Sequence, residues 1–264
     1  MSKEIDRLAG FCIVTGASSG IGLALAKLAA RDGCDLLLVA DSDLTEAQAA
    51  ARAGGAASVQ TLQTDLATRD GIIAVMDAVG DRYVDVLMAN AGVGQGGKLL
   101  DQEWGQIAHV LHTNITGTVS LIWRIGRQMR EVNSGRILVT GSIAGDMPGP
   151  FNLVYNSTKA FVDDFCVGLA NELQDTNVAV TCLLPGVTDT EFFENADMEN
   201  TMAGQSSSKA DPDKVAMDGY KALLKGDVKE VSGLMNKVQY FFADILPAEV
   251  VAKMHRRMAQ PKEG

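Results

Sequence analysis

Short apolar runs alternate with longer amphipathic stretches along this chain of 264 residues. Seven runs have the length and composition of strands: Phe11–Thr15, Asp35–Ala40, Ser58–Gln63, Val84–Ala89, Arg136–Thr140, Asn177–Leu184 and Val228–Val231. Asp35–Ala40 is almost wholly apolar, which is typical of a strand that helices cover on both faces. Strands alternating with helices predict one doubly wound α/β domain over residues 1–264, with a mostly parallel seven-stranded sheet and helices on both faces.

Most intervals between these strands carry apolar side chains at the three- and four-residue spacing of a helix. One helix is expected to begin near Leu23. The others are expected to cover Leu44–Ala53, Arg69–Val79, Asp101–Glu131, Asn152–Leu173, Pro212–Gly226 and Pro247–Met258, and Asp101–Glu131 is expected to be a single long helix. Residues 191–205 are rich in phenylalanine and methionine and resemble a mobile lid. We therefore expect residues 190–226 to form a substrate lid and the helix that follows it.

A glycine-rich turn stands between the first strand and the first helix. Gly16, Gly20 and Gly22 let the backbone turn tightly and approach a pyrophosphate, and the start of the helix offers free N–H groups to it. This is the first unit of a Rossmann dinucleotide-binding fold. The spacing Gly-x-x-x-Gly-x-Gly differs from the ordinary fingerprint, and turns also use glycine for steric reasons alone.

Asp41 follows the second strand, at the place where the adenosine ribose of a dinucleotide would lie. A carboxylate there binds the ribose hydroxyls of NAD and repels the 2′-phosphate of NADP, so we expect NAD, with NADP the less favoured cofactor. The alternative is that Asp41 or Asp43 only caps the helix Leu44–Ala53.

The stretch from Ser142 to Lys159 contains the candidate catalytic residues. Ser142 lies at the end of the fifth strand, while Tyr155 and Lys159 are four residues apart on the next helix and share a face. A nearby ammonium favours ionisation of a phenol, and a serine hydroxyl can hold a reacting oxygen, so the three residues suit proton transfer. By itself, one Tyr-x-x-x-Lys could also occur by chance on a surface helix.

Composition and charge exclude several classes of function. A net charge of −10 without a basic block argues against nucleic acid and anionic membrane surfaces. The ten N-terminal residues lack an apolar segment of signal-peptide length, and no run reaches the ~20 apolar residues of a membrane span. Four dispersed cysteines and three histidines argue against disulfides and against a metal site. We expect a cytoplasmic enzyme.

These motifs together resemble the short-chain dehydrogenase/reductase family from Phe11 to about Thr190. The matching residues are Gly16, Gly20 and Gly22, Asp65, Asn90, Ala91 and Gly92, the four residues Asn114, Ser142, Tyr155 and Lys159, and Pro185, Gly186 and Thr190. The resemblance places the cofactor against Gly16, Ser18, Ser19, Gly20, Ile21, Gly22, Asp41, Asp65, Leu66, Asn90, Ala91, Gly92, Tyr155, Lys159, Pro185, Gly186, Thr188 and Thr190.

The resemblance also implies a reaction: hydride transfer between a nicotinamide cofactor and a carbonyl or secondary alcohol. In it Tyr155 is the general acid and base, and Lys159 lowers the pKa of Tyr155 and binds the nicotinamide ribose. Ser142 holds the substrate oxygen, and Asn114 bends its helix and positions a water. The family's long helices around Asn114 and after Tyr155 pair subunits, so a homodimer or homotetramer is expected, although the C-terminal tail is atypical of the family.

Two other functions are compatible with parts of the sequence. One is an NAD-sensing protein without turnover, and the other is an NAD-dependent epimerase or dehydratase, which shares the Tyr-x-x-x-Lys pair. The presence of both Tyr155 and Lys159 favours the oxidoreductase. The candidate substrate residues are Gln95, Met147, Phe151, Phe192 and Phe193.

Overall fold

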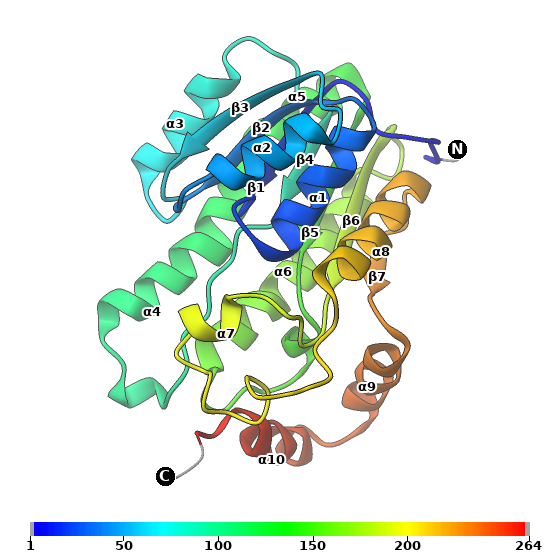
Figure 1. Ribbon diagram of the computed structural model, residues 1–264. Coiled ribbons are helices and arrows are strands. Elements are labelled where there is room, and N and C mark those ends of the chain that lie inside the picture. Colours follow the sequence, from blue (N-terminus) through cyan, green and yellow to red (C-terminus); the bar gives the residue numbers. More distant parts are fainter. Residues whose placement is uncertain (1–2, 262–264) are drawn as a thin grey trace.

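A seven-stranded parallel sheet forms the centre of the computed structural model, which describes residues 3–261 apart from the side chains of residues 241–245 (Figure 1). The strands are β1 (Phe11–Thr15), β2 (Asp35–Ala40), β3 (Ser58–Gln63), β4 (Val86–Ala89), β5 (Gly135–Thr140), β6 (Val178–Leu184) and β7 (Lys229–Val231). Their order is β3-β2-β1-β4-β5-β6-β7, and all six pairings are parallel. The predicted fold class is confirmed.

Two layers of helices cover the sheet. The helices are α1 (Gly20–Arg31), α2 (Thr45–Ala53), α3 (Arg69–Val79), α4 (Trp104–Leu111), α5 (Thr118–Val132), α6 (Leu153–Glu172), α7 (Phe192–Asn195), α8 (Pro212–Lys225), α9 (Leu234–Ile245) and α10 (Ala248–Ala259). The core on one face joins α1, α2 and α8 to the sheet, and the core on the other face joins α3, α5 and α6 to it. Strands covered on both sides explain the apolar runs of the sequence.

The strand order reverses between β1 and β4, where successive connections pass to opposite sides of the sheet. Ligands of open α/β sheets bind beside the carboxyl ends of the strands at such a point. Lys3 donates to the Val178 carbonyl oxygen at the start of β6, at the other end of the sheet, whereas α7, α9 and α10 gather near the carboxyl ends (Figure 1). The fold therefore brings the glycine turn and the residues after β4, β5 and β6 to one edge.

The single long helix expected over Asp101–Glu131 is wrong in detail. A 3-10 turn covers Leu99–Asp101, the chain is extended at Gln102 and Glu103, and only then does α4 begin. A π-helical segment, His112–Gly117, joins α4 to α5. A Cβ on Gly117 would lie 2.6 Å from the Leu66 carbonyl oxygen, so this segment packs tightly against the chain after β3.

The expected lid packs against the C-terminal tail. Residues Phe193, Ala196 and Met198 are buried in a small cluster that includes Ala259 of α10. The Ala203 N–H donates to the Met258 carbonyl at 3.2 Å. The lid therefore has its own apolar core, shared with α10.

Candidate active site

The turn between β1 and α1 has the shape of a phosphate cradle. Gly16 (φ 62°) and Gly20 (φ 52°) adopt left-handed conformations, and a Cβ on Gly22 would lie 1.9 Å from the Gly16 carbonyl oxygen. Among the described residues, no side chain hydrogen-bonds the N-terminus of α1 from its cap position, Ser19. The free N–H groups and the positive helix end are thus available to an anion.

Asn90, after β4, ties this turn to the middle of the sheet. Its Nδ2 donates to the carbonyl oxygens of Thr15 at 3.2 Å and Gly16 at 3.3 Å, while its Oδ1 accepts from Thr140 Oγ1 at 2.9 Å. A Cβ on Gly92 would lie 3.2 Å from Lys159 Nζ. The predicted residues Asn90, Ala91 and Gly92 therefore run from the glycine turn toward Lys159.

Asp41 lies exposed after β2, beside the glycine turn. Its neighbour Ser42 donates through Oγ to Ser18 Oγ at 2.9 Å. The cap position of α2 is Leu44, and in the described chain no side chain hydrogen-bonds the start of α2 from that position. Neither Asp41 nor Asp43 occupies the cap position of α2, so the alternative role of Asp41 has no support.

Other predicted cofactor residues take part in local packing. Asp65 Oδ1 accepts from the Ala67 N–H at 2.8 Å, Leu66 is buried in the core, and Ile21 packs against the core from the first turn of α1. Their backbone lies along the same edge of the sheet as the glycine turn. Asp65 holds the turn after β3, and the cofactor contact expected of it stays a prediction.

Tyr155 and Ser142 meet at the end of β5. Ser142 is buried, and its Oγ accepts from the Ala144 N–H at 3.1 Å. Burial raises the pKa of Tyr155 to about 12, and the negative charge of Asp163 also raises it, whereas a hydrogen bond with Ser142 lowers it. Tyr155 is therefore a protonated phenol at neutral pH. The lowering of this pKa expected from Lys159 stays a prediction.

Lys159 is buried below Tyr155 on α6. Its Nζ donates to the Thr140 carbonyl oxygen at 2.7 Å and lies 5.6 Å from the centroid of the Tyr155 ring. Burial lowers the pKa of Lys159, and the negative charge of Asp163 opposes this effect. The ammonium thus lies between the end of β5 and the phenol.

Asn114 lies in the π-helical segment His112–Gly117, which joins α4 to α5; the bend and the bound water expected of it stay predictions. Its Oδ1 accepts from the Val93 N–H at 2.8 Å, and its Nδ2 donates to the Val93 carbonyl at 2.8 Å and to Thr158 Oγ1 at 3.0 Å. Asn114 thereby joins the loop after β4 to α6, one residue before Lys159. Single-turn π-helices are frequent at functional sites.

The loop after β6 crosses from Ser142 to the start of α1. The Pro185 carbonyl accepts from the Ile143 N–H at 3.1 Å, and Thr188 Oγ1 donates to the Gly186 carbonyl at 2.9 Å. A Cβ on Gly20 would lie 2.7 Å from Thr190 Cγ2. The predicted residues Pro185, Gly186, Thr188 and Thr190 therefore border the same space as the glycine turn.

Phe192 contacts the catalytic face directly. Its ring centroid lies 4.9 Å from that of Tyr155, and a Cβ on Gly94 would lie 2.6 Å from Phe192 Cζ. Phe193 is buried beneath and meets Phe192 edge to face at 5.6 Å. Phe192 therefore covers the phenol, and Phe193 supports it.

The other three predicted substrate residues lie around this centre. Gln95 Nε2 donates to Asp197 Oδ2 at 3.2 Å and so fastens the lid. Met147 is buried, and Phe151 has a positive φ of 68° with the Arg256 guanidinium 5.4 Å from its ring centroid. The structure does not bring these three against Tyr155 as it does Phe192.

Sequence reasoning missed three residues near the site. Asp163 is buried one turn after Lys159, and His255 of α10 is buried with its Nε2 3.2 Å from Asn156 Nδ2. A Cβ on Gly186 would lie 2.4 Å from Asn236 Oδ1 of α9. The four-residue spacing from Lys159 could have revealed Asp163, whereas the contacts of His255 and Asn236 depend on how the tail folds back.

The residues present fit a dinucleotide. A Cβ at Gly16, Gly20 or Gly22 would collide with the chain's own atoms, so only glycine fits this tight turn; the start of α1 offers unpaired donors, and an exposed carboxylate, Asp41, stands beside the turn. Donors for a pyrophosphate, a partner for ribose hydroxyls and a catalytic phenol thus lie along one edge.

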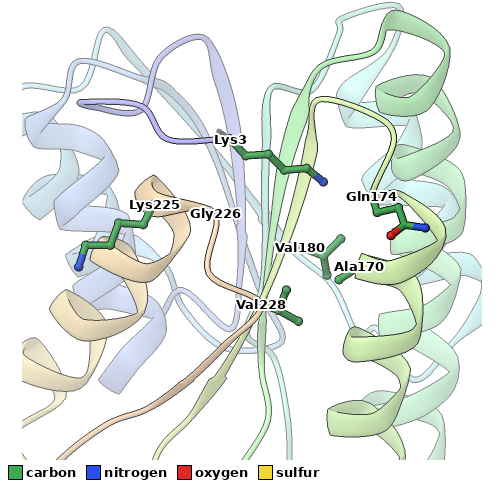
Figure 2. A pocket seen from close by; sticks show the side chains of 7 residues that line it. All are labelled: Lys3, Ala170, Gln174, Val180, Lys225, Gly226 and Val228. Carbon is green, nitrogen blue, oxygen red and sulfur yellow. The ribbon is translucent and has the colours of Figure 1, made fainter. Parts of the chain in front are cut away.

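A hollow of about 320 Å³ lies elsewhere, between the end of α8 and α6 (Figure 2). Lys3 Nζ donates there to the carbonyl oxygens of Leu173 at 3.1 Å and Val178 at 2.6 Å, and the Lys225 side chain points away from the other lining residues. Val178 begins β6, so this hollow lies at the amino ends of the strands, far from the catalytic edge.

Among the side chains described for residues 3–240 and 246–261, no cluster of three or more histidine, cysteine, aspartate or glutamate residues could hold a metal ion. In the described part of the chain, too, no helix has both the length and the apolarity needed to cross a membrane.

The sequence and the fold of this chain are similar to those of known proteins. A family model for short chain dehydrogenases matches residues 11–201. Human 17-beta-hydroxysteroid dehydrogenase type 1 is 36% identical over 190 residues, which are 69% of this chain and 58% of that protein. This chain thus spans less than two thirds of the length of that relative. An uncharacterized oxidoreductase of Staphylococcus epidermidis is 30% identical over 213 residues, 80% of this chain and 90% of that protein.

Among solved structures, a short-chain dehydrogenase from Sphingobium yanoikuyae in complex with NADPH superposes with a TM-score of 0.81 and 26% identity, covering 97% of this chain and 98% of that one. The chain therefore belongs to the short-chain dehydrogenase family.

Proposed function

We propose that this protein is an NAD-preferring carbonyl reductase or alcohol dehydrogenase with Tyr155 as its general acid and base. The observation that supports this most is the meeting of Ser142, Tyr155 and Lys159 beside the glycine turn. A bound dinucleotide supplies or accepts the hydride at its nicotinamide ring. Tyr155, whose pKa is about 12, is protonated at neutral pH and gives its proton to the carbonyl oxygen.

The other residues position the reacting groups. Ser142 donates a hydrogen bond to the substrate oxygen, which stabilises the charge that develops there. Lys159 provides a positive charge near the phenol, which assists the reverse reaction because alcohol oxidation requires Tyr155 to accept a proton. Asn114 holds the loop after β4 against α6.

The preference for NAD depends on Asp41. The Sphingobium structure contains NADPH, so the family alone leaves both cofactors open. The Asp41 carboxylate is exposed beside the glycine turn, in a position that suits the adenosine ribose. The predicted adenine-side contact of Asp65 belongs to the same proposal.

The substrate is a small carbonyl compound or secondary alcohol covered by residues 190–226. Phe192 above Tyr155 and the packed phenylalanine beneath it give this cover an apolar inner surface. All four cysteines are free, which suits the reducing cytoplasm. The epimerase and NAD-sensing alternatives have no observation in their favour here.

The decisive experiment measures NADH oxidation by the parent and by Tyr155→Phe against a panel of carbonyl compounds that includes steroid-like, aromatic, sugar and keto-acid members. We expect kcat to fall by at least ~100-fold in the variant, the usual size of one general-acid contribution. NADH affinity, measured by fluorescence titration, should hardly change because the ring remains. Activity of the variant within a factor of about two of the parent would exclude this role for Tyr155. NADH binding without turnover of any compound would favour the sensor.

A further inference from the structure

Asp163 is a buried carboxylate that the proposed mechanism does not use. It is 3% exposed and follows Tyr155 and Lys159 at four-residue spacing on one face of α6. Its Oδ1 accepts from Cys182 Sγ at 3.4 Å, and its Oδ2 has no hydrogen-bond partner among the described residues. Burying a carboxylate this deeply costs folding free energy, so we ask what Asp163 does for the residues around it.

The carboxylate presses against the backbone on both sides of Ser142. A Cβ on Gly141 would lie 1.9 Å from Asp163 Oδ1, and a Cβ on Gly145 would lie 2.5 Å from Asp163 Oδ2. Glycine is therefore required at both positions while Asp163 is in place. The segment that presents Ser142 to the substrate thus rests on this side chain.

Lys159 needs a negative charge nearby. It is 4% exposed, and its Nζ hydrogen bond goes to a neutral carbonyl, that of Thr140. Among the side chains that the structure describes, neither salt bridge involves Lys159: one joins Lys209 to Asp189 and the other joins Lys237 to Glu230. Burial lowers the pKa of Lys159, and Asp163 is the largest influence that raises it.

The titratable groups around Asp163 come from four parts of the chain. Lys159 lies one turn back on α6, Cys182 on β6, Asp146 after β5 and Lys229 on β7. Burial raises the pKa of Asp163 to about 7 and Asp146 adds to this rise, while Lys159, Cys182 and Lys229 lower it. A hydrogen bond with Cys166, and burial after it, raise the pKa of the Cys182 thiol well above its usual value, so that thiol is neutral.

We propose that Asp163 is a positioning residue of this active site, which keeps the Lys159 ammonium charged and supports the backbone that carries Ser142. The role in turnover rests on the function proposed above, but the effect on the charge of Lys159 does not. When Asp163 is ionised, Lys159 stays protonated in spite of its burial. When the negative charge is removed, Lys159 loses its proton at a lower pH.

An NMR titration tests the charge of Lys159 without requiring turnover. The full chain is labelled with lysine carrying 13C at Cε, and Lys159→Met assigns the Lys159 resonance. We expect the Lys159 midpoint in Asp163→Asn to fall by about one pH unit or more relative to the parent. Asp164→Asn, a change at the exposed neighbour on α6, should leave it unchanged. Equal midpoints in the parent and Asp163→Asn would overturn the proposal.

A pH profile of kcat/KM tests the consequence for turnover. In Asp163→Asn the alkaline limb should move to lower pH, so that activity falls about tenfold for each pH unit of displacement and recovers as the pH is lowered. A purely structural defect would lower activity equally at every pH and would overturn the positioning role. If the parent reduced no carbonyl compound, the proposed function would fail, while the NMR titration would still decide the charge of Lys159.

Discussion

At the scale of single residues, we expect cofactor choice to depend on the charge at Asp41. Its carboxylate accepts hydrogen bonds from ribose hydroxyls more strongly than a neutral group would. It also repels a 2′-phosphate of about −2 charge, at a cost that we set at about 1.5–3 kcal/mol after relaxation. We therefore expect a roughly 10- to 150-fold preference for NAD in kcat/KM.

Replacing Asp41 with arginine should shift this preference toward NADP, because a guanidinium matches a phosphate in a two-pronged geometry. The measurement is kcat/KM for NADH and NADPH with one carbonyl substrate, in the parent and in Asp41→Arg. Asp43→Arg is the matched control, two residues further from β2. Equal use of both cofactors by the parent would show that Asp41 does not bind the ribose.

Asp163 should also change how the stability of the protein depends on pH. Its folded-state pKa of about 7 lies above the ordinary value of 3.8, so the folded protein favours the protonated carboxyl. Its contribution to stability is complete below about pH 4 and is lost as the pH rises through about 7, because the ionised group is then buried at a cost.

Asp163→Asn removes that cost, so it should stabilise the protein more at high pH than at low pH. Since one pH unit within the titration window is worth ~1.4 kcal/mol, the gain should be about 2 kcal/mol larger at about pH 8 than at about pH 5.5. Thermal melts of the parent, Asp163→Asn and Asp164→Asn at both pH values measure this. A gain independent of pH would mean that Asp163 does not titrate in the folded state.

At the scale of elements, α7 covers the phenol of Tyr155. The Phe192 ring lies 4.9 Å from that of Tyr155, where a bulky ketone would need room. We expect Phe192→Ala to raise kcat/KM for bulky ketones relative to small ones by about 10-fold, the scale of hydrophobic pocket discrimination. The measurement is the ratio of the two kcat/KM values in each protein.

Phe193→Ala is the control for that change. Phe193 is buried against the lid cluster, so its loss should cost about 3 kcal/mol of stability without opening space at Tyr155. An unchanged ratio of kcat/KM values in Phe192→Ala would show that α7 moves away when a substrate binds.

The elements that the sequence predicted well are those with local signals. The strands were found to within about two residues because covered strands leave uninterrupted apolar runs. Asp211 and Gly226 bracket α8 as expected, through a hydrogen bond from the Asp213 N–H to the Asp211 side chain and a left-handed Gly226. The break near Asp101 was missed because helical periodicity continues through an extended pair and a π-helical turn.

The same distinction holds for the site. Parallel strands bring their carboxyl ends to one edge, so Ser142, Asn90 and the glycine turn could be placed together from the sequence. The packing of α10 on the lid and of Asn236 against Gly186 comes from a tail that folds back over the chain. The local sequence pattern near residue 236 does not predict such a contact.

At the scale of the whole molecule, α5 and α6 expose large apolar side chains. Trp123 of α5 is 56% exposed, and Phe161 of α6 is 42% exposed and stacks on Phe165 at 5.9 Å. Leu153 and Val167 of α6 are also exposed. Contiguous exposed apolar surface on a folded protein commonly marks a contact with another chain.

We therefore expect a homodimer or a larger homo-oligomer in which α5 and α6 of two copies pack together about a two-fold axis. In a two-fold interface each residue occurs twice, once in each copy, so a single substitution buries two charges. Phe161→Glu should thus weaken association by at least about 100-fold, because an unpaired buried charge costs several kcal/mol.

Light scattering at micromolar concentration should show the parent above the 27.9 kDa of one chain and Phe161→Glu near it. Leu100→Glu, at a residue 94% exposed outside both helices, is the control and should assemble like the parent. A parent that scatters only as one chain would contradict the interface, and an unaltered Phe161→Glu oligomer would place it on another surface.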